Sequence, residues 1–139
     1  MSIEAVEQRL VWTLPTDATC AKRARDLVDD TLTVLGVDRE VIRDAKLMVS
    51  ELATNSYRHA HEHPPHELWF DPGPREVVCA VFDSLPMAFD GDTTFSDDHG
   101  RGLNIVEELS GGRCGRHLTV SRLEPYAEGK AVWFAVQRG

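Results

Sequence analysis

The sequence predicts an α+β fold, a two-layer sandwich in which helices cover one face of a β-sheet. The expected order of elements is strand, helix, helix, strand, strand, loop, helix, strand, strand, so the helices are segregated from pairs of strands. The 139 residues suit a single domain, 1–139, that is large enough to bury a core without disulfide support. No internal repeat, low-complexity tract or linker divides the chain.

The first strand is expected at residues 9–14, RLVWTL, an apolar run that ends before Pro15. Thr16 or Asp17 can cap the helix that follows, and Gly36 ends it. Apolar side chains recur in this helix at intervals of three and four residues, which predicts one buried stripe. The stripe comprises Ala21, Ala24, Leu27, Val28, Thr31, Leu32 and Leu35.

A second helix is expected to begin after Asp38, a good N-cap residue, and to run to about Ala60. The segment HEHPPH then ends it, because proline lacks an amide hydrogen and disfavours helical geometry in the preceding residue. Its buried stripe comprises Val41, Ile42, Ala45, Met48, Val49, Leu52, Ala53 and Ser56.

Two strand pairs and a short helix complete the predicted fold. The turn DPGP joins the first pair, and Gly111 and Gly112 stop the helix. The polar segment 84–102 is too long for a passive connection, which makes it a candidate binding loop or lid. The strands are expected at 67–70, 76–83, 117–123 and 130–137, and the helix at 103–110.

Charge and cysteine content exclude several classes of protein. A formal charge of −8 argues against sequence-independent binding of DNA or RNA, and it suits a basic protein partner better. The N-terminus lacks the features of a signal peptide, and no apolar stretch could cross a bilayer, so a soluble cytoplasmic protein is expected. Cys20, Cys79 and Cys114 include no CxxC pair and are expected to be reduced thiols.

The stretch SELATNSYRHA carries Glu51, Asn55 and His59 at four-residue intervals. Residues with this spacing lie along one side of a helix, so the three side chains can face one ligand together. Asn55 and His59 are therefore candidate cofactor-binding residues. The alternative is a solvated edge beside the apolar stripe.

Two further features point to a ligand. Asp83 ends the apolar strand EVVCAVFD, where a carboxylate can accept a hydrogen bond from a ligand amine; the alternative is an ordinary turn residue. Gly100 and Gly102 directly precede the short helix, whose free amides and positive dipole end favour an anion such as phosphate. The alternative there is a flexible loop.

The segments ELATNSYRHA, VFDSLP and GRGLNIVEEL, in this order, resemble the N, G1 and G2 boxes of the GHKL ATP-binding superfamily. More narrowly, the chain resembles the anti-sigma-factor serine/threonine kinases and their small bacterial relatives from Leu10 to Gln137. The resemblance implies the Bergerat fold, with a mixed, mostly antiparallel sheet, and it implies ATP and Mg²⁺ as cofactors.

The resemblance also implies roles for individual residues. Asn55 would coordinate the magnesium ion, Glu51 would act as the general base, and Asp83 would accept from the adenine amino group. Residues 87–99 would form the ATP lid. The phosphates would be cradled by Gly100, Arg101, Gly102 and Leu103.

Three departures from the family pattern bear on nucleotide affinity rather than on the fold. Leu85 stands where the wider superfamily has a glycine, and Ala131 where many relatives have a threonine beside the adenine. One lost hydrogen bond costs about 1 kcal/mol. The lid is also acidic, which is unfavourable for phosphates unless magnesium or a partner offsets the charge. Its acidic residues are Asp90, Asp92, Asp97 and Asp98.

The leading functional hypothesis is an ATP-dependent kinase that phosphorylates a serine on an antagonist protein and sequesters a sigma factor. The alternative is a noncatalytic regulator that binds a protein partner and has a degenerate nucleotide site; a stand-alone ATPase ranks last. Similar kinases often dimerise, and Val11 and Trp12 of the first strand are candidates for such an interface.

Other conspicuous residues have simpler readings. The histidines of RHAHEHPPH match no standard zinc spacing, so a solvated helix end is preferred to a metal site. Trp12, Trp69 and Trp133 are expected in the sheet core or at an interface.

Overall fold

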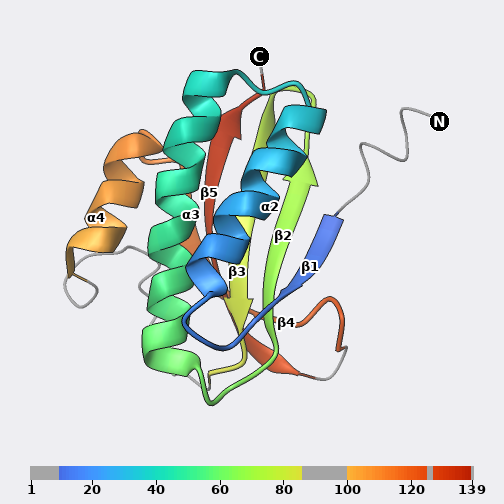
Figure 1. Ribbon diagram of the computed structural model, residues 1–139, viewed down its shortest axis with the longest axis vertical. Coiled ribbons are helices and arrows are strands. Elements are labelled where there is room, and N and C mark those ends of the chain that lie inside the picture. Colours follow the sequence, from blue (N-terminus) through green and yellow to red (C-terminus); the bar gives the residue numbers. More distant parts are fainter. Residues whose placement is uncertain (1–9, 86–99, 125–126, 139) are drawn as a thin grey trace.

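A computed structural model describes residues 10–85, 100–124 and 127–138 of the chain (Figure 1). Its five strands form one sheet in the order β1-β2-β3-β5-β4, and every neighbouring pair is antiparallel. The elements are β1 (Leu10–Leu14), α2 (Cys20–Val34), α3 (Arg39–Ala60), β2 (His66–Pro72), β3 (Glu76–Asp83), α4 (Gly100–Leu109), β4 (Cys114–Val120) and β5 (Glu128–Gln137).

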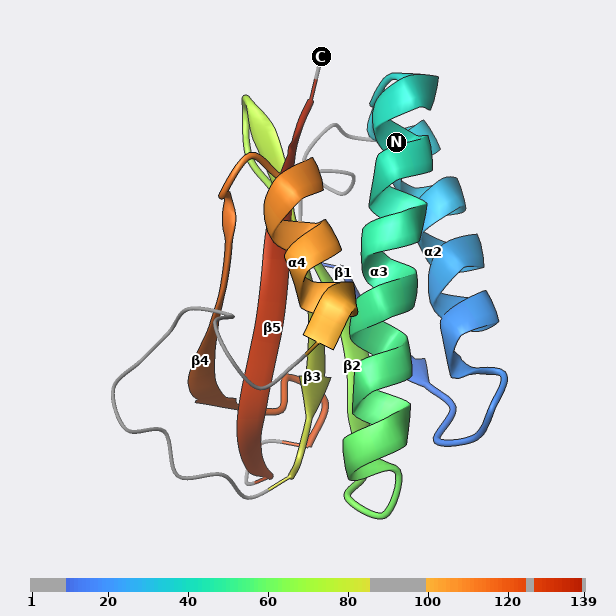
Figure 2. The same cartoon turned by 90° about the vertical axis from the view of Figure 1, so that its left-hand side faces the viewer.

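The predicted two-layer α+β arrangement is confirmed. Figure 2 shows the sheet edge-on, with α2, α3 and α4 all on one side of it. The main core lies between these layers, because alternate side chains of each strand point toward the helices. Its largest fully buried side chains include Phe70 and Phe134 from the sheet and Leu32, Ile42 and Met48 from the helices.

The two long helices follow the predicted apolar stripes, and Asp38 is the N-cap of α3 as expected. Gly36 adopts a φ of 80°, a left-handed conformation that glycine tolerates best. The amide of Val37 then donates to the carbonyl of Leu32 at 3.0 Å, which closes the end of α2 as a Schellman motif. None of the helices in the described part of the chain is long and apolar enough to cross a membrane.

The start of α2 differs from the expectation, because its N-cap is Thr19 and not Thr16 or Asp17. The Asp17 carboxylate instead accepts a hydrogen bond from the backbone amide of Thr19 at 2.8 Å. Aspartate readily forms such a local turn with the amide two residues on, and this turn delays the helix.

The helix α4 begins earlier than expected, at Gly100 rather than at Leu103. Leu103 and Val106 are 2% and 0% exposed and pack into the main core. Anchoring these side chains places the glycines in the first helical turn, where the amides have no intrahelical partners in any case.

The strand β4 covers residues 114–120 and not the expected 117–123. Ser121 ends it: its hydroxyl accepts hydrogen bonds from the amides of Leu123 and Glu124, at 3.0 and 2.7 Å. These bonds turn the chain away from the sheet ladder, a local competition that is typical of serine.

The sheet face opposite the helices has a small core of its own, formed by Trp69, Ala80, Phe82 and Ala131. Trp133 is half-buried beside it, whereas Trp12 on the edge strand β1 is 39% exposed. Trp69 thus lies in a sheet core, as expected for the tryptophans, while Trp12 remains a surface residue.

Candidate functional site

The candidate site is organised around Asp83, the last residue of β3, which is only 1% exposed. Its Oδ2 atom accepts hydrogen bonds from the Ser56 hydroxyl of α3 at 2.7 Å and from the Lys130 ammonium of β5 at 2.6 Å. Its Oδ1 atom accepts from the backbone amide of Leu85 at 3.2 Å. A buried carboxylate requires partners of this kind, and the ammonium supplies the compensating charge.

The sheet register explains why Lys130 meets Asp83. These two residues are directly opposite in the antiparallel β3–β5 pair, and both side chains lie on the helix-facing side of the sheet. Ser56 reaches them because it belongs to the buried stripe of α3. Helix and sheet therefore fix the carboxylate from two sides.

Gly129 allows the end of β3 to lie very close to β5. A Cβ atom at Gly129 would lie 2.0 Å from the carbonyl oxygen of Asp83 and 2.8 Å from the Cα atom of Ser84. Real atoms do not approach this closely, so only glycine fits without moving the backbone. The Ser84 hydroxyl adds a hydrogen bond to the carbonyl of Glu128 at 3.0 Å.

Glu51 and Asn55 lie in the C-terminal half of α3, and both are half-buried. Within the described residues neither side chain has a hydrogen-bond or ion-pair partner. His59 is exposed, so the structure does not bring it into the half-buried part of the site. No described residue therefore competes with a ligand for the carboxylate or the amide.

The segment that contains Gly100 and Gly102 forms the first turn of α4, and this helix packs beside α3. Figures 1 and 2 show the N-terminal end of α4 pointing toward the end of the molecule where α3 also ends. The free amides of such a turn favour an anion. Of the residues predicted to cradle phosphate, Gly100, Arg101, Gly102 and Leu103, all lie in this turn; Leu103 is buried, so only its backbone could serve.

One sequence-based expectation about the site is wrong. Ala131 does not lie beside Asp83, because its side chain is on the sheet face away from the helices, packed in the core with Trp69 and Phe82. Strand side chains alternate, so its neighbour Lys130 takes the position next to the carboxylate. The expected loss of a hydroxyl at Ala131 is therefore replaced by the gain of an ammonium group.

Two other expectations concern the connection after Asp83. Leu85, which stands in the superfamily's glycine position, contacts Asp83 through its backbone amide, and its side chain is half-buried. The proposed lid at 87–99 lies outside the described residues.

Sequence reasoning missed three residues of this site: Ser56, Lys130 and Gly129. Ser56 had a visible signal, a polar residue within an otherwise apolar stripe directly after Asn55. Lys130 and Gly129 had none, since their place follows from the register of strands about 45 residues apart, which a single sequence does not display.

The histidines after α3 have separate environments. His66 is fully buried and its Nε2 atom lies 2.7 Å from the carbonyl oxygen of Ala60. The Nδ1 atom of His61 lies 3.1 Å from the carbonyl oxygen of Tyr57. Among the described residues no group of three potential ligands could hold a metal ion.

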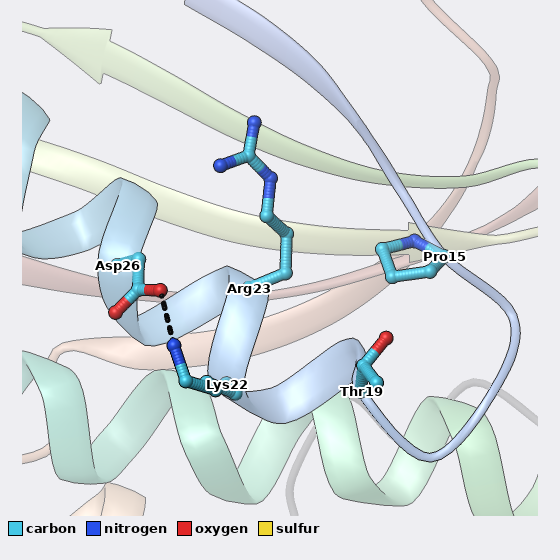
Figure 3. A pocket seen from close by; sticks show the side chains of 5 residues that line it. All are labelled: Pro15, Thr19, Lys22, Arg23 and Asp26. Carbon is cyan, nitrogen blue, oxygen red and sulfur yellow. Dashed lines mark hydrogen bonds and ion pairs between the residues drawn. The ribbon is translucent and has the colours of Figure 1, made fainter.

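Two hollows lined by described residues lie away from Asp83. A shallow one of about 300 Å³ lies at the start of α2 (Figure 3), where Lys22 is paired with Asp26 at 2.9 Å and Arg23 points toward a neighbouring strand. Another, of about 170 Å³, lies on the sheet face opposite the helices between Trp69 and Trp133. Neither shares a residue with the cluster around Asp83.

Comparison with known proteins identifies the family. The model of the histidine kinase-like ATPase domain family matches residues 14–112, which include α2, α3, β2, β3 and α4. A comparison with curated proteins found no match. The match covers most of the chain and all three helices around the candidate site, and the antiparallel sheet with helices on one face agrees with it. The chain therefore belongs to the family of histidine kinase-like ATPase domains, the GHKL type.

Proposed function

We propose that this ATPase-family domain is an anti-sigma-factor-type regulator. It binds ATP with Mg²⁺ between α3, the end of β3 and the first turn of α4. It transfers phosphate to a serine of an antagonist protein, and it sequesters a sigma factor in the cytoplasm.

The observation that carries this proposal is the contrast within α3. The Ser56 hydroxyl donates a hydrogen bond to Oδ2 of the buried Asp83 at 2.7 Å. The side chains of Asn55 and Glu51, on the same helix, have no hydrogen-bond or ion-pair partner within the described residues. Water can reach these half-buried groups, and a ligand that replaces this water would find their oxygens unoccupied by any described residue. This supports a ligand that spans from Asp83 to the side of α3 that bears Glu51 and Asn55.

The donor atoms on α3 suit magnesium. Mg²⁺ prefers oxygen ligands and keeps several waters, and Asn55 offers an amide oxygen on the side of the helix that also bears Glu51. Bound magnesium would neutralise negative charge on the phosphates. Glu51 would accept the proton of the attacking serine hydroxyl, and the amides of the first turn of α4 would hold phosphate oxygens.

A noncatalytic regulator that binds its partner by contact alone is the second candidate. Leu85 favours it, because a side chain stands where the superfamily has glycine and changes the shape of the expected adenine pocket. The retention of Glu51 argues for catalysis, since a pure binding protein needs no base there.

Calorimetric titration of ATP, with and without Mg²⁺, tests the nucleotide site in the wild type and in Asn55→Ala. We expect binding that depends on magnesium in the wild type and loses this dependence in the variant. Arg58→Ala is the control, because it alters an exposed residue on the same helix and should keep the dependence. Absence of binding in the wild type would favour the contact-only regulator.

Phosphotransfer is tested separately, with candidate antagonist proteins and Glu51→Ala. If the protein is a kinase, we expect Glu51→Ala to lose phosphate transfer to the antagonist but to retain its affinity for nucleotide and for the sigma factor. Sound nucleotide binding without transfer to any antagonist would contradict the kinase and leave the regulator.

A further inference from the structure

We propose that Lys130 is a second residue that recognises the adenine base. Its ammonium donates a hydrogen bond to N1 of adenine, the ring nitrogen next to the amino group that donates to Asp83. The inference rests on the proposed nucleotide site and deepens it. It assigns the site a preference for adenine over hypoxanthine and guanine that depends on Lys130.

The hydrogen-bond inventory of Asp83 leaves room for one base amine. Its Oδ2 atom already accepts from Ser56 and Lys130, at 2.7 and 2.6 Å. A carboxylate oxygen accepts about two hydrogen bonds, so Oδ2 is saturated. Within the described residues Oδ1 accepts only from the amide of Leu85, at 3.2 Å, which leaves it one position for a ligand donor.

The Lys130 ammonium has N–H donors left over for a hydrogen-bond acceptor on a ligand. An ammonium has three N–H donors, and the described residues supply one acceptor, Asp83. The side chain is only 12% exposed, so bulk water is not freely available to the remaining donors. A largely buried ammonium gains from a second acceptor, and an acceptor on a bound ligand would supply it.

The two groups together form a pattern that matches one edge of adenine. Asp83 offers an acceptor, and Lys130, 2.6 Å from the same carboxylate, offers a donor beside it. Adenine carries an amine donor next to the N1 acceptor, as required. Hypoxanthine and guanine carry a carbonyl acceptor next to an N1–H donor, so in the same orientation both contacts would be repulsive.

The test measures binding of ATP and of 1-deaza-ATP, in which a C–H replaces N1, to the wild type and to Lys130→Met in the presence of Mg²⁺. The wild type should prefer ATP by about tenfold or more, since a hydrogen bond to a charged group is lost in the analogue. In Lys130→Met the two affinities should become equal. Lys46→Met is the matched control, because Lys46 is paired with Asp29 at 2.9 Å and should leave the preference unchanged.

Inosine triphosphate provides the second readout: the wild type should reject it, and Lys130→Met should bind it with a smaller penalty relative to ATP. Equal binding of ATP and 1-deaza-ATP by the wild type would overturn the inference while leaving the nucleotide site intact, and this arm needs no variant that must fold. Absence of any ATP binding would overturn the proposed function itself, and the inference with it.

Discussion

The carboxylate of Asp83 stabilises the fold and is also the group predicted to bind the ligand. It is almost completely buried, and its charge is balanced by Lys130, whose side chain is 12% exposed. Taking such charges out of water is expensive, and their mutual attraction offsets the cost only while both are present. The loss of either partner should therefore be felt in folding as well as in binding.

Asp83→Asn should lower the free energy of unfolding by about 3 kcal/mol, because it leaves the Lys130 ammonium without its counter-charge. Adding Lys130→Met should recover at least about 1 kcal/mol of this loss. Urea unfolding of the wild type, both single variants and the double variant measures the coupling. Strictly additive effects would show that the ion pair is not coupled in the native state.

Cys20 provides a pH-dependent contribution to stability at the residue scale. The thiol is buried, and burial together with the nearby Asp17 raises its pKa from 9.0 to about 11. Above pH 9 the unfolded chain loses this proton while the folded chain keeps it, so the unfolded state binds fewer protons and stability falls as pH rises. The loss of stability occurs between pH 9.0 and about 11.

In this window Cys20 should contribute a fall in the unfolding free energy of up to about 1.4 kcal/mol per pH unit. Cys20→Ala removes the contribution, so its stability should fall less steeply with pH even if the variant is less stable at pH 7. Urea unfolding at several pH values compares the slopes. Cys79 is also buried and its pKa is also raised, so some slope should remain in the variant. Parallel curves for the two proteins would contradict the prediction.

The site residues divide into those that sequence indicates and those that it does not. Helical spacing places Glu51 and Asn55 on the same side of α3, and the resemblance of ELATNSYRHA to the N box assigns them to the site. Lys130 becomes recognisable only once β3 and β5 are aligned, since a one-residue shift in register would place Ala131 beside Asp83 instead.

At the scale of elements, the contact between the end of β3 and the start of β5 is unusually close. Gly129→Ala would place a Cβ atom 2.0 Å from a backbone oxygen, so the strands must separate. We expect a loss of more than about 2 kcal/mol in the free energy of unfolding. Gly36→Ala is the control: its Cβ would meet nothing within 4 Å, and only the φ of 80° opposes it, at a cost of about 1 kcal/mol. Similar losses for both variants in urea unfolding would show that β3 and β5 adjust freely.

The connection after β4 is anchored to β2 by Glu67, a carboxylate that is fully buried on the sheet face opposite the helices. It accepts hydrogen bonds from Trp69 Nε1 at 2.8 Å, from the backbone amide of Arg122 at 3.0 Å and from the Ser121 hydroxyl. The guanidinium of Arg122 in turn lies over the Trp69 ring, 4.0 Å from its centre.

Glu67→Ala would leave these donors without an acceptor, so the free energy of unfolding should fall by about 3 kcal/mol or more. Glu76→Ala removes a partly exposed carboxylate paired with Arg113 and should cost less than about 1 kcal/mol. Urea unfolding followed by tryptophan fluorescence compares them. Equal losses would mean that the buried network does not anchor the connection.

The helices could be predicted because the spacing of apolar residues and the residues that end a helix are local features of the sequence. The stripes of α2 and α3 and the glycine after α2 specify those helices from neighbouring residues. The ends of elements were less predictable where a side-chain oxygen accepts a hydrogen bond from a nearby backbone amide and so competes with the helix or the sheet. Asp17 does this before α2, and Ser121 does it after β4. The core on the second sheet face could not be inferred from any single strand.

For the whole molecule, the proposed site joins elements that are distant in sequence: α3 supplies Ser56 and Asn55, β3 supplies Asp83, β5 supplies Lys130, and α4 supplies its first turn. A ligand bound by all of them exists only on the folded chain. Its binding free energy therefore adds to the free energy of global unfolding.

Saturation with ATP and Mg²⁺ at about one hundred times the dissociation constant should stabilise the wild type by about 2.7 kcal/mol. Asn55→Ala should unfold like the wild type without ligand, because Asn55 has no partner within the described residues, but it should gain less from ATP and Mg²⁺. Lys22→Ala, at the exposed pair beside the hollow of α2, should gain as much as the wild type. Chemical denaturation with and without ligand measures all three proteins, and an equal gain for Asn55→Ala would place the magnesium-dependent contact elsewhere in the fold.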